Sequence, residues 1–102
     1  MKLSVKQAKF AHMIALLILH AEQLGYLLTF GDAYRDKRCS YGHRQSLHKL
    51  RLAVDFNLFI DGEYIKDSRG HDELHEYWES IGGSPMTWDD PNHYSLEHNG
   101  MR

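Results

Sequence analysis

The sequence predicts an α+β fold in which helices pack on a small, mainly antiparallel sheet. Three observations support this prediction: a long helical periodicity at the N-terminus, an alternating apolar pattern near the middle, and a tight turn directly after it. The chain has 102 residues, of which 42% are hydrophobic and 25% charged. This is the composition of an ordinary globular protein, so we expect one domain over residues 1–102.

The first predicted element is an amphipathic helix over residues 5 to 24. Neither Gly nor Pro occurs between Ser4 and Gln23. Apolar side chains recur there at steps of three and four, which is the helical period. Ser4 is the expected N-cap and Gly25 the expected stop. The periodic residues are Phe10, Met13, Ile14, Leu17, Ala21 and Leu24.

Two strands and a hairpin are predicted next. Residues 26 to 30 are apolar, aromatic or β-branched and end at Gly31, which indicates a short strand. Residues 52 to 60 alternate between two faces, one of them apolar and the other carrying Asp55. Asp61-Gly62 is a strong turn signal, so residues 63 to 66 should return beside this strand.

The remaining elements are a second helix, two loops and a last short strand. Residues 72 to 81 form the predicted helix, which ends at Gly82, and residues 93 to 96 form the strand. Residues 32 to 45 and 84 to 92 are polar or proline-containing and are predicted to be loops. The helix has its apolar side chains at helical spacing: Leu74, Tyr77, Trp78 and Ile81.

Composition argues against several classes of function. The net charge is -2 with neutral histidines, so no basic excess favours nucleic acid. Cys39 is the only cysteine, which excludes an internal disulfide and fits cytoplasmic synthesis. The apolar run near residues 15 to 19 lacks the features of a signal peptide. No stretch approaches the roughly 20 apolar residues of a membrane span, so we expect no stable membrane insertion.

Three residues predict a metal site. Histidine is the commonest metal ligand, and the chain contains 8. His48 and His93 supply two imidazoles, and Asp55 supplies a carboxylate from the middle of an otherwise apolar strand. A half-buried carboxylate needs a partner, and a catalytic zinc takes three such ligands and keeps one position open. The chain must turn between residues 48 and 52 for both of the first two ligands to reach one ion.

Asp90 is the predicted general base. It stands three residues before His93, and the following Pro91 biases it toward an extended or turn conformation. A carboxylate beside the open position of a metal can take a proton from the attacking water.

These residues resemble a known family. The run from Ser46 to Asp55 resembles the S-x-H-x-x-G-x-A-x-D signature of the D-Ala-D-Ala metallopeptidases, which include D,D-carboxypeptidases and phage L-alanyl-D-glutamate endopeptidases. Asp90 and His93 match the second motif, an acidic residue followed by two others and a histidine. Arg51 stands where the signature has glycine and cannot adopt glycine's backbone conformations freely, so the turn after His48 is where this chain departs from the family.

The resemblance implies a hedgehog/D,D-peptidase-like fold and one zinc ion per chain, held by His48, Asp55 and His93. It implies that Arg35, in the Tyr34-Arg35 pair, binds a substrate carboxylate. Ser46 is grouped with Arg35 on the substrate side; from the residues alone it either orients His48 or caps a turn. The implied substrate is the stem peptide of bacterial peptidoglycan.

The short chain without a signal peptide is more similar to phage-type endopeptidases, which act as endolysins on the cell wall after release. Such an enzyme depends on a membrane-permeabilising partner. The alternatives are a D-Ala-D-Ala carboxypeptidase and a non-catalytic, zinc-stabilised binding module of the same fold. A competing metal pair is His71 and His75, one helical turn apart. The Glu needed directly after the first histidine is Asp72 here, so we interpret this pair as part of a solvated helix face.

Overall fold

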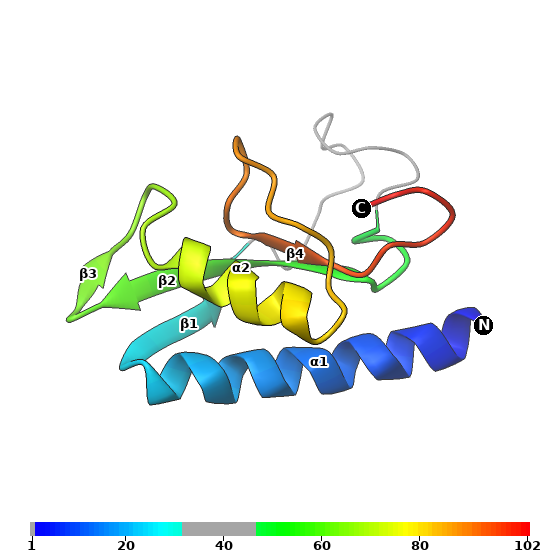
Figure 1. Ribbon diagram of the computed structural model, residues 1–102, viewed down its shortest axis with the longest axis horizontal. Coiled ribbons are helices and arrows are strands. Elements are labelled where there is room, and N and C mark those ends of the chain that lie inside the picture. Colours follow the sequence, from blue (N-terminus) through cyan, green and yellow to red (C-terminus); the bar gives the residue numbers. More distant parts are fainter. Residues whose placement is uncertain (1, 32–46) are drawn as a thin grey trace.

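The structure is a computed structural model that describes residues 2–31 and 47–102. Two helices and a small antiparallel sheet form the described part of the chain, which confirms the α+β class (Figure 1). The elements are α1 (Leu3–Gln23), β1 (Tyr26–Phe30), β2 (Ala53–Ile60), β3 (Glu63–Tyr64), α2 (His71–Ser80) and β4 (His93–Ser95). The predicted loop over residues 32 to 45 lies outside the described residues.

Helix α1 buries the stripe that its periodicity predicts, namely Phe10, Met13, Leu17 and Ala21. Its end is also as predicted, because Gly25 follows with a φ of 81°. The prediction of Ser4 as N-cap is wrong: Lys2 is the cap residue, and no side chain caps the helix. The helix starts earlier because Leu3 packs against the core. In the described part of the chain, no helix is long and apolar enough to cross a membrane.

Strand β2 is the centre of the sheet. All of β1 pairs antiparallel with β2, from Tyr26 opposite Ile60 to Phe30 opposite Phe56. The predicted hairpin leads to β3, and Asp61 and Gly62 have φ values of 52° and 79°. Positive φ at both turn residues is the type I′ geometry, which matches the twist of the flanking strands.

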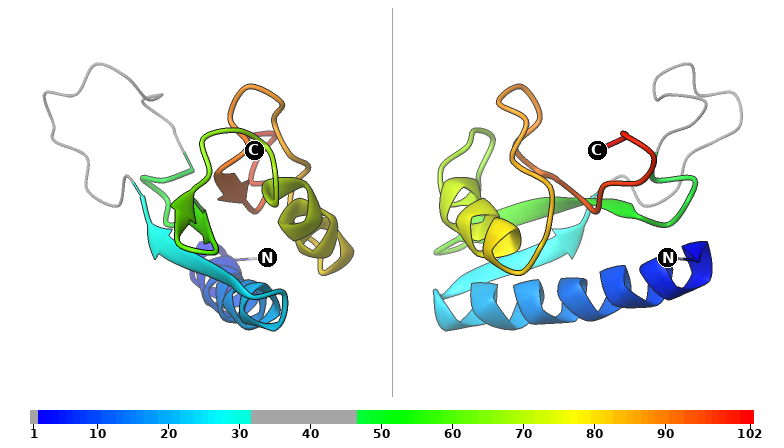
Figure 2. Two further views of the ribbon diagram at one scale, coloured as in Figure 1. Left: turned by 90° about the vertical axis from the view of Figure 1, so that its left-hand side faces the viewer. Right: turned by 45° about the vertical axis from the view of Figure 1, so that its right-hand side comes forward.

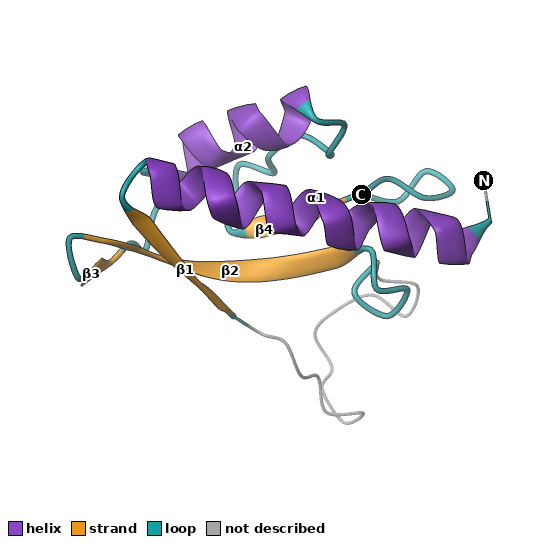
Figure 3. Cartoon of the chain, turned by 90° about the horizontal axis from the view of Figure 1, so that it is seen from below, coloured by secondary structure: helices purple, strands orange, loops and turns teal. Residues whose placement is uncertain are grey.

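The two faces of β2 have different neighbours. Phe56 and Leu58 are buried beneath the helices, and α1 and α2 lie together against this core face (Figures 2 and 3). Alternation puts Asp55 and Phe59 on the opposite face, which we call the outer face. The candidate site is therefore on the side of the sheet away from α1.

An aromatic cluster joins the helices to the sheet. The ring of Tyr94 in β4 contacts the rings of Phe56 and Trp78, at centroid distances of 5.7 and 6.0 Å. Phe10 of α1 meets Trp78 edge-on at 5.8 Å. The indole of Trp78 also donates a hydrogen bond of 2.9 Å to the carbonyl oxygen of Ser95. These contacts fix β4 relative to the core, and they therefore also fix His93, the residue before Tyr94.

The turn between His48 and β2 forms as the sequence requires. The amide of Arg51 donates to the carbonyl of His48 at 3.1 Å, and the amide of Leu52 donates to that of Leu47 at 2.8 Å. Arg51 adopts a φ of 59°, the left-handed region that glycine occupies without strain. The departure from the family signature thus leaves the turn intact, with an arginine in a glycine-like conformation.

We predict that Arg51→Gly stabilises the protein. A non-glycine residue in the left-handed region carries about 1–2 kcal/mol of strain, and the greater freedom of glycine in the unfolded chain offsets part of the gain. Urea unfolding should show a free energy of unfolding that is higher by about 1 kcal/mol. Arg51→Ala is the matched control, since alanine keeps the strain. An equal gain in both variants would mean that the arginine side chain, not its backbone, is unfavourable.

Candidate metal centre

Strand pairing brings two of the predicted ligands together. In the register of β2 with β4, Asp55 lies directly opposite His93. Directly opposite residues of an antiparallel pair have Cβ atoms about 4.5–5.5 Å apart on the same face. Two side chains 38 positions apart in the sequence therefore meet on the outer face.

The turn before β2 brings in the third ligand. His48 lies in the turn after Leu47, whose side chain is buried in the core. The rings of His48 and His93 meet edge-on, with centroids 5.1 Å apart. His48 therefore approaches the carboxylate of Asp55 next to His93.

The three side chains form a group that can hold a metal ion. One ligand atom from each lies within 4.8 Å of the others, namely from His48, Asp55 and His93. Oδ1 of Asp55 is 3.2 Å from Nδ1 of His93 and 3.5 Å from Nε2 of His48. A tetrahedral zinc with bonds of about 2.0–2.1 Å separates its ligand atoms by about 3.3 Å. The spacing and the donor types both fit such an ion.

The carboxyl of Asp55 is held in its ionised form. Burial of the side chain raises its pKa, but hydrogen bonds and charge interactions with His48 and His93 lower it more. The net result is a pKa well below the usual range for aspartate. An ionised carboxylate is the form that binds a metal, so this residue needs no proton loss before it can act as a ligand.

Asp90 lies beside this group without belonging to it. It lies on the loop before β4, where its amide donates to the carbonyl of Thr87 at 2.9 Å and its carbonyl accepts from the amide of His93 at 3.1 Å. Partial burial and repulsion from Asp55 raise the pKa of Asp90, against a lowering effect of His93. A carboxyl near the metal ligands with a raised pKa is suited to accept and return a proton.

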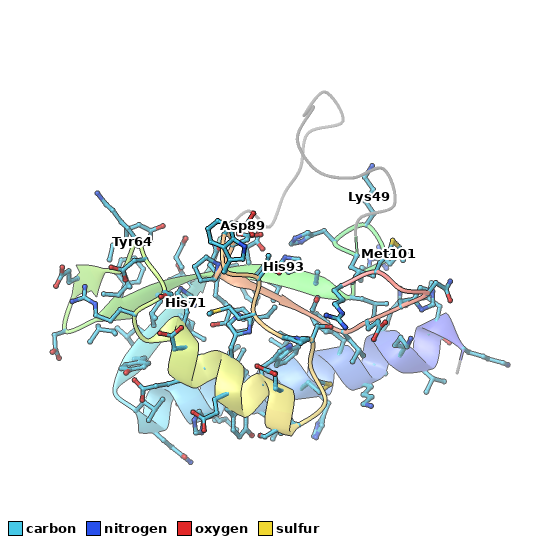
Figure 4. All side chains as sticks on the ribbon, turned by 45° about the horizontal axis from the view of Figure 1, so that its top comes forward. Lys49, Tyr64, His71, Asp89, His93 and Met101 are labelled. Carbon is cyan, nitrogen blue, oxygen red and sulfur yellow. The ribbon has the colours of Figure 1, made fainter. Side chains whose placement is uncertain are left out.

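A cavity of about 210 Å³ adjoins this loop, with Asp90 and Asn92 in its wall together with Tyr64 and Lys66. Figure 4 labels Asp89 and His93 near the centre of the view and Tyr64 towards its left. The two predicted substrate-side residues, Arg35 and Ser46, lie outside the described residues.

The interpretation of His71 and His75 as a solvated helix face is wrong. Each is only 2% exposed. Nδ1 of His71 lies 2.7 Å from the hydroxyl of Tyr94, and His75 stacks on the same ring with centroids 4.1 Å apart. Nε2 of His75 donates to the carbonyl oxygen of Pro91 at 2.8 Å. This bond connects α2 to the loop that carries Asp90 and leads into β4 at His93.

A sequence signal for this role was present. His71 and His75 fall at the helical steps of the buried residues Leu74 and Trp78, so all four form one stripe. The polarity of histidine favours the solvent side, which is why the sequence predicts a solvated face for this pair. A flat ring with one hydrogen bond is buried readily when its partner is fixed, as the carbonyl of Pro91 is here.

We predict that acid destabilises the metal-free protein through these two histidines. Burial lowers the pKa of His71 and of His75 to about 4, from a usual value of 6.5. Between these values the unfolded chain binds more protons. The two histidines therefore make their full contribution to the free energy of unfolding above pH 6.5. This contribution falls as the pH drops toward 4, by up to about 1.4 kcal/mol per pH unit for each histidine.

Urea unfolding in the presence of a chelator measures this slope. His75→Phe keeps a flat ring against Tyr94 but cannot titrate, so it should remove the share of one histidine from the slope. An unchanged slope in this variant would contradict the assignment.

We also predict one bound divalent ion per chain. Each of the variants His48→Ala, Asp55→Ala and His93→Ala should lose the ion, because two remaining ligands bind it far more weakly. Elemental analysis of protein dialysed against a metal-containing buffer measures the content. Asp89→Asn is the control, since this neighbouring carboxylate is not among the three. Full metal content in all three ligand variants would place the ion elsewhere.

Comparison of the chain with protein-family models, with curated proteins and with solved structures finds no match. The assignment of a function therefore depends on the geometry of the three ligands and Asp90, together with the order of the motifs in the sequence.

Proposed function

We propose that the chain is a zinc-dependent peptidase that cleaves stem peptides of bacterial peptidoglycan, in the manner of a phage-type L-alanyl-D-glutamate endopeptidase. The observation that carries the proposal is the outer-face group of His48, Asp55 and His93 with Asp90 beside it. The substrate class is what the resemblance of these residues to the motifs of the D-Ala-D-Ala metallopeptidases implies. The hedgehog/D,D-peptidase-like fold is part of the same proposal.

Zinc is the metal that suits this donor set best. Two imidazoles and one carboxylate are the ligands of several catalytic zinc sites, and a set of three leaves a position open. All three side chains are largely shielded, with 15% of the His48 side chain, 11% of Asp55 and 16% of His93 exposed. When bound, zinc supplies a Lewis acid for the peptide carbonyl and lowers the pKa of water to about 7.

Asp90 performs the proton transfers in this proposal. Its carboxylate accepts the proton of the attacking water and then gives it to the leaving amine. Its raised pKa favours the first step, because a base of higher pKa binds the proton more readily. The bond from His75 to Pro91 holds the loop, so that Asp90 stays close to the metal ligands.

Arg35 and Ser46 complete the proposal on the substrate side. A guanidinium can pair with a substrate carboxylate through two parallel hydrogen bonds, and stem peptides carry such carboxylates. An enzyme that reaches the cell wall only after release would act together with a membrane-permeabilising protein.

The decisive prediction concerns Asp90→Asn. The asparagine keeps the size of the side chain but cannot take the proton. Cleavage of purified peptidoglycan should fall by about 100-fold or more, while zinc content and the free energy of unfolding stay unchanged. Mass spectrometry of the released peptides identifies the bond that is cut.

Asp89→Asn is the matched control, because it removes a neighbouring exposed carboxylate and should leave cleavage nearly intact. If the wild-type protein binds zinc but cleaves no type of peptidoglycan, the chain is the non-catalytic, zinc-stabilised binding module and not a peptidase. Release of a terminal D-alanine alone would identify a carboxypeptidase instead.

A further inference from the structure

A row of apolar side chains crosses the outer face of the sheet. Phe59 of β2 pairs with Leu27 of β1 on one side and with Tyr64 of β3 on the other. Residues paired in register point to the same face of a sheet, so the three side chains lie next to one another. We call these three residues, Leu27, Phe59 and Tyr64, the aromatic row after its two aromatic members.

The aromatic row is open to solvent. Leu27 is 63% exposed and Tyr64 is 46% exposed. The rings of Phe59 and Tyr64 are in contact, with centroids 5.6 Å apart. Phe59, between Leu27 and Tyr64, is partly exposed. A contiguous apolar patch that is open to solvent is typical of a binding surface.

The row is continuous with the candidate metal centre. Asp55, Asn57 and Phe59 alternate along the outer face of β2, so the row lies four residues, or about 13 Å, from the ligand. Asn57 fills the space between them, opposite Thr29 of β1. Between Asp55 and the row, the described outer-face residues are Thr29 and Asn57, which carry a hydroxyl and an amide and no charge.

The chemistry of this path fits a carbohydrate. A pyranose ring has an apolar face of C–H groups that packs against an aromatic ring, and its hydroxyl groups take hydrogen bonds from amides and hydroxyls. An acidic or basic ligand would need a charged partner on the path, and of the described residues neither Thr29 nor Asn57 provides one. A second copy of the chain fits less well, because a stable dimer buries about 800 Å² on each partner and three side chains offer much less.

We propose that the aromatic row binds the amino-sugar strand to which the stem peptide is attached. This inference rests on the proposed peptidase function and narrows its substrate to glycan-linked peptides. The L-alanyl-D-glutamate bond is separated from the sugar by one residue and a lactyl linker, about 7 Å in extended form. The sugar ring then begins near Asn57 and reaches the row. If the enzyme cleaved a bond at the far end of the stem peptide instead, the sugar would lie beyond the aromatic row.

Titration with a β-1,4-linked N-acetylglucosamine tetramer tests the row directly. Calorimetry on the full chain, in the presence of a chelator, should show binding by the wild type. Tyr64→Ser and Phe59→Ser should each weaken it by about tenfold, or 1.4 kcal/mol. Leu19→Ser is the matched control, because Leu19 is 55% exposed on α1, away from the outer face. Should Phe59→Ser fail to fold, the more exposed Tyr64 decides the result.

Two outcomes would overturn the inference. The first is the absence of tetramer binding by the wild type, or equal binding by all variants. The second is concentration-dependent self-association that Tyr64→Ser abolishes, which would make the row an interface between copies.

A kinetic comparison separates this inference from the proposed function. The wild type should cleave a glycan-linked stem peptide with a higher kcat/KM than the same free peptide, and Tyr64→Ser should remove the preference without changing cleavage of the free peptide. If both substrates are cleaved without preference, the inference about the aromatic row is wrong and the proposed peptidase function stands. If the tetramer binds in a way that depends on Tyr64 but neither substrate is cleaved, the inference about the aromatic row stands and the proposed peptidase function is wrong.

Discussion

The pairing of β4 with β2 is the constraint on which the candidate site depends. It sets His93 opposite Asp55, and it sets Tyr94 opposite Val54 on the core face. A shift by one residue would turn every side chain of β4 to the other face, because the side chains of a strand alternate. It would move the histidine into the core and the tyrosine to the surface. The position of a metal ligand is therefore decided by how well its neighbour packs.

Tyr94 supplies that packing. Its ring is fully buried between Phe56, Trp78 and the stacked ring of His75. Burial of a large aromatic side chain is worth several times the thermal energy, so alternative registers of the short strand are disfavoured. His75 adds a second restraint through its bond to Pro91. The core and the loop before β4 thus hold the site from two directions, and α2 takes part in both.

The electrostatics of Asp55 show why the site forms as a unit. A largely buried carboxylate on a sheet is unfavourable when it has no partner. Here two imidazoles hydrogen-bond to it and keep its pKa low despite burial. The same three groups that stabilise one another are the donors that a metal needs. Removal of either histidine leaves the carboxylate with one partner fewer, so the ligands are expected to depend on one another for stability as well as for metal binding.

The sequence by itself determined the local elements and the identity of the ligands. Periodicity gave the two helices, alternation gave β2, and Asp61-Gly62 gave the hairpin, because each depends on residues only a few positions apart. The order of the motifs singled out His48, Asp55, Asp90 and His93. The tertiary structure decided what depends on distant partners: the contacts of His71 and His75 with Tyr94 and Pro91, the start of α1 at Leu3, and the alignment of the aromatic row with the site. These features follow from packing between segments far apart in the chain, which no local pattern records.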